Sequence, residues 1–419
     1  MGGRVLARRG GLWGHPDFLK LWTAQTVSSF GARIAREGLP LAAVVALKAG
    51  PEAIGVFAAL RLGPRVLVGL FAGPLIDRLP RRPVLIVSDL ARAAVLAAVP
   101  IATLLHSLTL AEVYAAGALM SVFDVAFDMA DHAYLPSLVE VDQVVEGNTK
   151  LGATDALAET GGPALYGALF SVLAAPVAVA ATAVTYLFSA LCLATIKARP
   201  RSGPAEDEEP IRLLDIARGV RACLAHPLVR PLFAMDLMRA FFGSFYAALY
   251  LIYVLQVLKL SVLLLGLAVA SGGIGALVGA TLTPTLTRRA GVGPIIVLTG
   301  LFAGVVGFLT PLAFGPPLVA FGFLVAAQLL SDASATVTEI TATSLRQTVM
   351  PPALLGRAAG AFMAAQGLAG ILGAVIGGVL GHGAGVRETL FIAAIGLALA
   401  PLIGLASPLW RTREVSGSR

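Results

Sequence analysis

The sequence predicts an all-α membrane protein with twelve transmembrane helices arranged as two six-helix pseudo-repeats. Three observations support this fold class. Of the 419 residues, 57% are hydrophobic and only 13% are charged, with a mean hydropathy of +0.86, whereas soluble domains average about 25% charged residues. The apolar residues gather in long runs, and the two halves of the chain match at a fixed offset. Lipid is therefore the expected solvent for most of the chain.

Long apolar runs set the expected number of spans. A helix needs about 20 mostly apolar residues to cross a bilayer, and twelve segments of the chain meet this requirement. The expected spans are 18–47, 52–76, 83–106, 109–132, 149–174, 176–197, 228–258, 261–287, 293–314, 316–342, 355–381 and 386–409.

The distribution of Lys and Arg predicts the orientation of these spans. If the N-terminus lies inside, the expected outer loops contain only Lys48, Lys259 and Arg387. Loops rich in Lys and Arg face the cytoplasm, so both termini are expected there, in the inner (plasma) membrane of a bacterium. The net charge of +7 is spread over separate short loops, which gives no support to nucleic-acid binding.

A shift of 211 residues aligns the two halves of the chain without a gap. The matched positions include His15-Pro16 with His226-Pro227, Pro83 with Pro294, Asp128 with Glu339, Gly162 with Gly373, and Gly167 with Gly378. Such an offset indicates duplication of a six-span unit, which places a substrate cavity between the halves. The expected domains are an N-terminal bundle (1–197), a cytoplasmic linker with an amphipathic helix (198–227) and a C-terminal bundle (228–419).

The linker divides into two parts. Its first part is rich in Pro, Gly and acidic residues, and its second part has apolar residues at helical spacing, with Arg212, Arg218 and Arg221 between them. This pattern predicts a short basic amphipathic helix on the inner leaflet. Its expected role is a lid or tether between the halves, with regulatory lipid binding as the alternative.

The stretch from Gly73 to Arg82 joins the second and third expected spans. It holds one acid and three arginines, Asp77, Arg78, Arg81 and Arg82. The stretch resembles the G-x-x-x-D-R-x-x-R-R signature of the major facilitator superfamily of transporters, with Pro80 where that family usually has glycine. The resemblance implies an inner gate. Asp89 and Arg92 in the third span are expected to join this gate as a charge network that breaks when the halves rock.

Other segments resemble one branch of that superfamily, the bacterial exporters that include enterobactin-type siderophore and macrolide efflux proteins. The matching segments are Phe18-Leu19-Lys20-Leu21-Trp22, Leu39-Pro40, His226-Pro227 and Leu345-Arg346-Gln347. The resemblance implies export of a bulky organic compound but does not identify it. One departure is Ala32, because relatives often have an acid there. Glu37 is expected to take over the role of that acid in coupling, or a residue elsewhere in the chain performs it.

The first span contains a polar stripe at helical spacing. Gln25, Arg33, Arg36 and Glu37 lie along one face. A charge in mid-bilayer costs about 2.5 to 3.5 kcal/mol on insertion scales, so such residues are functional candidates with partners. Arg33 and Glu37 are expected to pair at i,i+4. Either this pair only neutralises itself, or Glu37 exchanges a proton or a cationic substrate beside the arginines.

The fourth span contains three acids on one face. Asp124, Asp128 and Asp131 lie at i, i+4 and i+7, and the span has no Lys or Arg. Their charge must therefore be balanced by water or by another helix. Asp131 is expected to be solvated at the cytoplasmic end, whereas Asp124 and Asp128 are expected to carry protons or bind cations.

The tenth span repeats this pattern. A polar stripe at helical spacing comprises Gln328, Asp332, Thr336, Glu339 and Thr343, and Glu339 is the repeat partner of Asp128. The stripe is expected to line the cavity and couple transport to protons, with hydrogen-bonded helix packing as the alternative.

The seventh span contains an expected local ion pair and a row of tyrosines. Asp236 and Arg239 are spaced for an i,i+3 pair, and Tyr246, Tyr250 and Tyr253 follow. The tyrosines are expected either to face a bulky ligand or to anchor the helix at the membrane interface.

The sequence predicts a secondary active transporter, coupled to protons and exporting a small-molecule substrate. It contains no phosphate-binding G-x-x-x-x-G-K-[ST] motif and no His/Cys cluster with metal-ligand spacing. An enzyme and a cofactor are therefore not expected, and the partners are substrate, protons and lipid, with a monomeric chain. The alternatives are an importer or uniporter of the same fold, or a non-transporting sensor or lipid-handling protein.

Overall fold

The computed structural model describes residues 11–71, 79–173, 175–197 and 213–413, and its regular structure is helical. The first group of helices comprises α1 (Pro16–Ala46), α2 (Pro51–Phe71), α4 (Arg81–Leu104), α5 (Leu110–Leu138), α6 (Val144–Val172) and α7 (Ala175–Ala194). The second group comprises α9 (Val229–Ile252), α10 (Val262–Ala290), α11 (Val292–Gly307), α12 (Pro317–Val349), α13 (Pro352–Gly383) and α14 (Val386–Leu405). The shorter α8 (Leu213–Ala225) precedes the second group.

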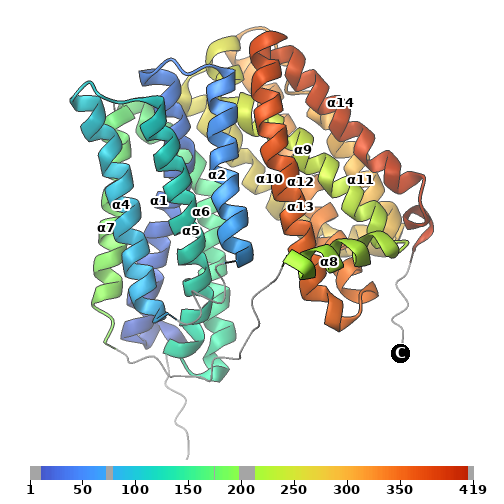
Figure 1. The fold of residues 1–419 in the computed structure, drawn as a ribbon, viewed down its shortest axis with the longest axis horizontal. Coiled ribbons are helices and arrows are strands. Elements are labelled where there is room, and N and C mark those ends of the chain that lie inside the picture. The colour runs from blue at the N-terminus through green and yellow to red at the C-terminus, as the bar shows by residue number, and fades with distance from the viewer. Residues whose placement is uncertain (1–10, 72–78, 174, 198–212, 414–419) are drawn as a thin grey trace, which may run out of the picture.

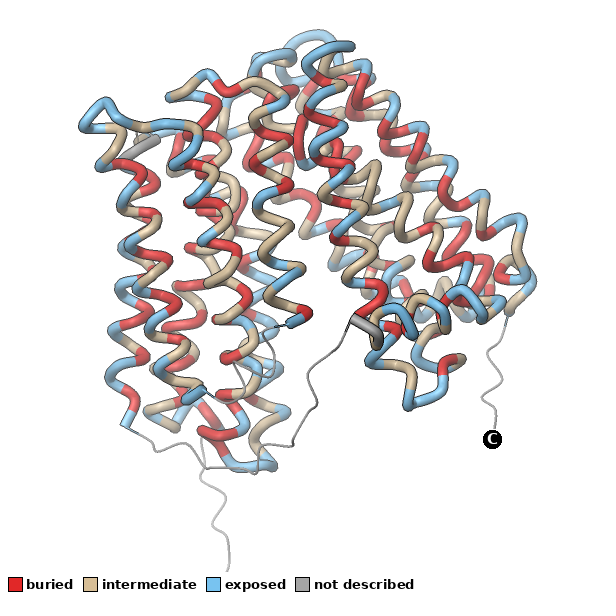
Figure 2. Tube along the Cα trace, in the orientation of Figure 1, coloured by how far each residue is buried: buried red, intermediate tan, exposed pale blue. Residues whose placement is uncertain are grey.

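Each group packs mainly on itself. In the first group, which we call the N-terminal bundle, α4 packs on α5 and α7, and α1 packs on α6 and α7. In the second, the C-terminal bundle, α10 packs on α12, and α9 packs on α13 and α14. The bundles stand side by side (Figure 1), with buried residues along the interior of each (Figure 2). They meet through α2 with α13, α2 with α9, and α6 with α10.

Among the described residues, nine helices are long and apolar enough to cross a membrane. These helices carry large apolar side chains on their outer surfaces, including Leu187, Leu191 and Leu277. Such a surface suits lipid but not water. The helices α1 and α6 are as long as many of the nine but contain charged residues along their length. The chain is therefore a multi-pass membrane protein with two polar helices among the apolar ones.

The bundles touch most closely at two pairs of glycines. A Cβ atom on Gly55 of α2 would lie 2.9 Å from the Cα atom of Gly378 in α13. A Cβ atom on Gly266 of α10 would lie 2.8 Å from the Cα atom of Gly167 in α6. The 211-residue offset converts one pair into the other. Because glycine lets helix backbones approach, the bundles cross at two equivalent points, at the end remote from α8.

The helix α8 docks on the C-terminal bundle. A Cβ atom on Gly219 would lie 2.1 Å from the backbone oxygen of Arg357 in α13, and Asp215 forms an ion pair with Arg357 at 3.4 Å. Cys223 is fully buried, whereas Leu224 is exposed. The predicted linker helix therefore exists, and one face of it is occupied by α13.

Candidate functional site

A cleft of about 350 Å³ lies between the two bundles. Its walls come from α1 and α6 on one side and from α10 and α12 on the other. The lining residues are Arg36, Glu159, Pro163, Val269, Gly272, Gly273, Ala276, Gln328, Asp332, Ala335, Thr336 and Glu339. The volume lies within the range of small-molecule sites, about 300 to 1,000 Å³.

The N-terminal wall is a network of ion pairs centred on Glu159. Its Oε2 atom lies 2.8 Å from Nη2 of Arg33, and its Oε1 atom lies 2.9 Å from Nη2 of Arg36. Arg36 also pairs with Glu37, at 3.3 Å from Nε to Oε1. Of this network, Arg36 and Glu159 line the cleft, and the network as a whole balances the charges of two arginines with those of two glutamates.

The expected pairing of Arg33 with Glu37 was wrong. Gly162 on α6 brings that helix against α1, since a Cβ atom there would lie 2.5 Å from Cβ of Arg33. Glu159, one turn earlier on α6, consequently reaches both arginines. The sequence analysis missed Glu159, although α1 carries one more arginine than acid in this stretch, Arg33 and Arg36 against Glu37. That imbalance is the signal that a second acid was needed.

The C-terminal wall contains acids without cationic partners. Oδ2 of Asp332 accepts a hydrogen bond from Nε2 of Gln328 at 2.8 Å, and its backbone oxygen accepts from Thr336 at 2.8 Å. Within the described part of the chain, Glu339 has neither an ion pair nor a hydrogen bond. Gly272 faces Asp332 so closely that a Cβ atom would lie 1.9 Å from its Oδ2 atom. Of the five residues of the expected α12 stripe, all but Thr343 line the cleft, and their wall is acidic.

A second charged cluster lies inside the N-terminal bundle. Arg92 of α4 donates to Asp89 at 2.6 Å and to Asp124 of α5 at 3.2 Å, and Asp89 also accepts from Ser28 at 3.2 Å. Asp89 is 0% exposed and Arg92 is 2% exposed. The Arg92 guanidinium lies 4.1 Å from the ring centroid of Phe127. The cation that balances Asp124 therefore comes from a neighbouring helix.

This cluster corrects the expected inner-gate role of Asp89 and Arg92. Both residues and their partner Asp124 belong to the N-terminal bundle. A relative movement of the two bundles leaves these ion pairs intact. Asp89 and Arg92 thus hold one bundle together instead of joining two.

The remaining motif residues fall into two sets. Gly73, Asp77 and Arg78 lie outside the described residues. Arg81 donates to the backbone oxygen of Ala133 at 2.5 Å. Arg82 donates to the backbone oxygens of Leu193 and Ala194 at 3.0 and 2.6 Å. These two arginines therefore bind carbonyl groups of α5 and α7 within the N-terminal bundle. The carboxyl ends of helices carry partial negative charge, which attracts such cations.

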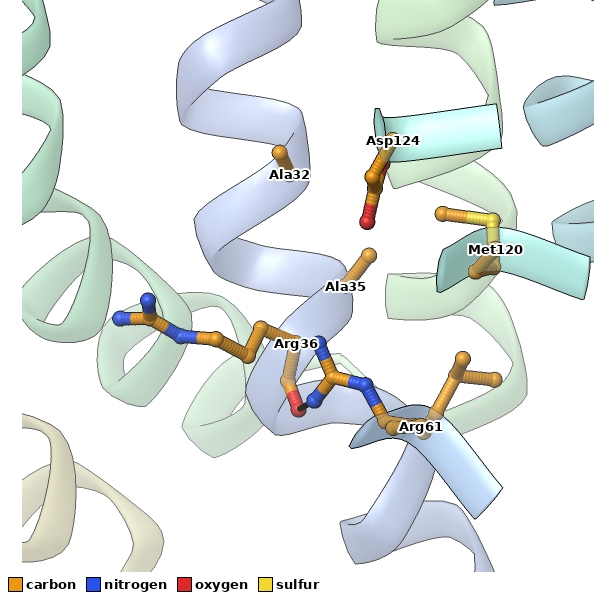
Figure 3. Close-up of a pocket in the computed structure, with 7 residues that line it drawn as sticks. Ala32, Ala35, Arg36, Arg61, Met120 and Asp124 are labelled. Atoms are coloured by element: carbon orange, nitrogen blue, oxygen red, sulfur yellow. Dashed lines mark hydrogen bonds between the residues drawn. The ribbon is translucent and has the colours of Figure 1, made fainter. Parts of the chain in front are cut away.

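A small cavity adjoins the buried cluster (Figure 3). It has a volume of about 10 Å³ and is lined by Ala32, Ala35, Arg36, Leu39, Arg61, Met120 and Asp124. A cavity of this size holds about one water molecule. Arg36 lines both this cavity and the cleft.

The other two acids of α5 occupy different surroundings. Asp128 is exposed and lines neither of these cavities. Asp131 has a buried Oδ1 atom with no hydrogen-bond partner among the described residues, which contradicts its expected solvation. Asp128 and Glu339, although equivalent by sequence offset, therefore do not both line the cleft.

Three residues expected in the substrate cavity lie away from the cleft. The Tyr246 hydroxyl donates to the backbone oxygen of Gly307 at 3.0 Å, so it links α9 to α11. Gln25 is 7% exposed. The Gln25 Nε2 atom and the Tyr250 hydroxyl are buried without partners in the described part of the chain. Tyr253 is fully buried, and its hydroxyl donates to the backbone oxygen of Pro311. It therefore neither contacts a ligand in the cleft nor anchors the helix at the membrane interface.

The expected pair in the seventh span is confirmed. Nη2 of Arg239 lies 2.8 Å from Oδ1 of Asp236. Gln366 of α13 donates to the other oxygen of Asp236. This pair therefore also fixes α9 against α13.

Comparison with known proteins identifies the family. The model of the Major Facilitator Superfamily matches residues 21–374. A multidrug efflux pump, Tap of Mycolicibacterium fortuitum, is 26% identical over 369 residues, covering 84% of this chain and 86% of that protein.

Solved structures show the same fold. The inward-facing structure of a bacterial homologue of the iron transporter ferroportin matches with a TM-score of 0.77 at 18% identity, covering 95% of this chain and 99% of that chain. An outward-facing structure of a bacterial ferroportin homologue, with soaked iron, gives a TM-score of 0.58 at 18% identity, covering 94% and 99%. The chain belongs to the Major Facilitator Superfamily and is a membrane transporter, not an enzyme.

Proposed function

We propose that this transporter exports a bulky organic compound from a bacterial cell in exchange for protons, by alternating access to the cleft. The observation that carries the proposal is the cleft itself. Its walls belong to different bundles, and the C-terminal wall presents Asp332 and Glu339, for which the described part of the chain supplies no cationic partner. Rocking of one bundle against the other would expose these acids to each side of the membrane in turn. The likeness to a multidrug efflux pump favours export.

The proposed topology has twelve spans in two six-helix repeats. The repeats are residues 1–197 and 228–419, joined by the cytoplasmic linker 198–227. We place both termini in the cytoplasm and the protein in the inner membrane as a monomer. The two glycine crossings support the duplication, because the offset of the sequence repeat interchanges them.

The two walls have different proposed roles. Asp332 and Glu339, with Gln328 and Thr336, bind the substrate or the protons that compete with it, because no ion pair among the described residues balances the charge of the two acids. On the opposite wall, Arg33, Arg36, Glu37 and Glu159 form a balanced network that orients α1 and α6. Asp124 and Asp128 remain candidates for proton coupling in the N-terminal bundle.

The proposal is tested in inverted membrane vesicles with an imposed pH gradient. Adding ethidium or a macrolide should dissipate the gradient in vesicles that contain the wild-type protein. Asp332→Asn and Glu339→Gln should remove this response with normal membrane insertion. The control is Glu388→Gln, because Glu388 is exposed and lies outside the cleft.

Three outcomes contradict the proposal. Unchanged proton flux in both cleft variants would remove these acids from the coupling step. Higher accumulation of the probes in cells that contain the protein would identify an importer. Saturable binding of the probes without flux would indicate a non-transporting sensor.

A further inference from the structure

The two acids of the C-terminal wall lie on one face of α12, seven residues apart. Both Asp332 and Glu339 line the cleft. Seven residues advance an α-helix by about 10 Å and rotate it through nearly two full turns. The two carboxylates therefore face the cleft at two separate levels of the helix axis, and one small cation cannot contact both.

The lining of the cleft has more negative than positive charge when both acids are ionised. Arg36 lines the cleft, and its charge is already used in ion pairs with Glu159 and Glu37. Within the described residues, neither Asp332 nor Glu339 forms an ion pair. A ligand with two positive charges would therefore balance the cleft, whereas a ligand with one would leave one acid without a cation.

The surface beside the two acids is apolar. Val269 and Ala276 of α10 line the cleft and are also seven residues apart, so they span the same length of the site. Ala335 of α12, which lies between the two acids in sequence, and Pro163 of α6 add to this lining. Such side chains favour burial of hydrocarbon. The part of a ligand that joins its two charges is therefore expected to be apolar.

The Asp332 end of the site has acceptors for a group with several N–H donors. Gln328 uses its NH2 group to donate to Oδ2 of Asp332 at 2.8 Å. Its Oε1 atom is then an acceptor, and no described residue donates to it. A primary ammonium has three N–H donors, so it can bind Asp332 and Gln328 together. A quaternary ammonium has no N–H group and cannot.

A tyrosine near this end also lacks a partner. The Tyr250 hydroxyl of α9 is buried without a hydrogen-bond partner in the described part of the chain, and the charge of Asp332 acts on it. Buried hydroxyl groups are rarely left unpaired. The Asp332 end therefore lacks a polar group that a ligand can supply.

We propose that the cleft binds a compound with two protonated amino groups about 10 Å apart on a hydrocarbon frame, one at Asp332 and one at Glu339. Aliphatic amines are protonated at neutral pH, as the lysine side chain is. This inference rests on the proposed function and specifies the class of its substrate.

The test measures binding of simple amines to the purified full-length protein in detergent by isothermal titration calorimetry at neutral pH. The probes are octylamine, diaminobutane, diaminooctane and octamethonium, the quaternary analogue of diaminooctane. With bonds of about 1.5 Å, the nitrogens of extended diaminooctane are about 11 Å apart and those of diaminobutane about 6 Å. Heats measured with the double variant Asp332→Asn/Glu339→Gln are subtracted, because octylamine also enters micelles.

The wild-type protein should select its ligand by length and by N–H groups. Diaminooctane should bind about 10- to 100-fold more tightly than octylamine, because it adds a second charge-assisted contact. Diaminobutane is too short to reach both acids and should bind more weakly than diaminooctane. Octamethonium matches the spacing but cannot donate to Gln328, so it should also bind more weakly.

Moving one acid should move the preferred length. Glu339→Gln should bind diaminooctane no more tightly than octylamine. The double variant Thr336→Glu/Glu339→Gln places the second acid four residues from Asp332, about 6 Å along the helix. Diaminobutane should then become the tightest ligand, a gain that misfolding cannot produce. Glu388→Gln, which lies outside the cleft, is the control and should keep the wild-type order.

Four results overturn the inference. These are equal affinities of the wild-type protein for octylamine and diaminooctane, the absence of amine binding, tighter binding of octamethonium than of diaminooctane, and an unchanged order of affinities in Thr336→Glu/Glu339→Gln.

The inference and the proposed function fail separately. Proton flux driven by ethidium or a macrolide, in a protein whose amine binding does not depend on length, overturns the inference while the proposed function stands. Length-dependent diamine binding by a protein that shows no proton flux supports the inference and counts against exchange for protons.

Discussion

The two bundles have the same spacing of helices in sequence but differently built interiors. The N-terminal bundle is held by the buried ion pairs of Asp89, Arg92 and Asp124. At a shift of 211 residues the C-terminal bundle has Gly300, Ala303 and Ala335. There the helices pack directly, and a Cβ atom on Gly300 would lie 3.1 Å from Pro401. Positions that match at the 211-residue offset therefore carry a charged cluster in the N-terminal bundle and small apolar side chains in the C-terminal bundle.

The two walls of the cleft differ in charge balance, and here the unbalanced charge belongs to the C-terminal bundle. The N-terminal wall pairs its arginines with Glu159 and Glu37. The C-terminal wall leaves Asp332 and Glu339 without a cation among the described residues. A ligand or proton therefore meets unbalanced charge on the C-terminal wall. Four sets of substitutions test these differences between the two bundles.

The largest expected effect is the loss of Arg92. Arg92→Met leaves two buried carboxylates without their cation, which should destabilise the protein by about 3 to 5 kcal/mol. Ala303→Met, at the equivalent position, should cost only about 1 to 3 kcal/mol from overpacking. Thermal unfolding in detergent, followed by size-exclusion fluorescence, measures both. Equal destabilisation by Arg92→Met and Ala303→Met would show that the N-terminal bundle does not depend on its buried charges more than the C-terminal bundle depends on its packing.

The glycine crossings should respond equally in the two copies. Gly55→Val and Gly266→Val both insert side chains where the backbones touch, at a cost of about 1 to 3 kcal/mol each to the present arrangement. That cost changes the population of this state by about 5- to 150-fold. Spin labels on the two bundles would report the shift towards a wider separation at this end. An effect confined to one variant would contradict equivalent crossings.

Removal of Glu159 tests whether the N-terminal wall is balanced. Glu159→Gln leaves Arg33 and Arg36 with only Glu37, so the cleft gains net positive charge and should bind ethidium more weakly. Loss of a hydrogen bond partner for a charged group costs about 1 to 3 kcal/mol. Equilibrium binding of ethidium, compared with Glu388→Gln, measures the change. Tighter binding of ethidium by Glu159→Gln would contradict the assignment of a charge-balancing role to Glu159.

The smallest expected effect concerns the linker helix. Burial raises the pKa of the Cys223 thiol, and the thiolate is the reactive form. Maleimide labelling of Cys223 should therefore be slow at neutral pH and should accelerate as the pH rises. Gly219→Leu, which would separate α8 from α13, should make labelling faster. Rapid labelling of the wild-type protein would show that α8 is not docked.

The helices themselves were largely predictable because long apolar runs leave few alternatives in lipid. The expected span 261–287 corresponds to α10 at Val262–Ala290. The expected span 293–314 was too long, because α11 ends at Gly307. The apolar residues beyond Gly307 continue as turns, which hydropathy does not distinguish from helix.

The partners of the charged residues were not predictable from spacing along one helix. The i,i+4 rule paired Arg33 with Glu37, but Gly162 brought Glu159 closer. Asp124 found Arg92 on another helix. Such pairings depend on which helix faces which, and sequence spacing does not contain that information.

The central claim is that the acidic wall of the cleft becomes accessible from each side of the membrane in turn. The direct measurement is modification of Thr336→Cys, in a background without other cysteines, by a membrane-impermeant thiol reagent in right-side-out and inverted vesicles. The account predicts reaction from both sides, with the two rates changing in opposite directions when a pH gradient is imposed. Reaction from one side alone, at a rate that does not respond to the gradient, would contradict it.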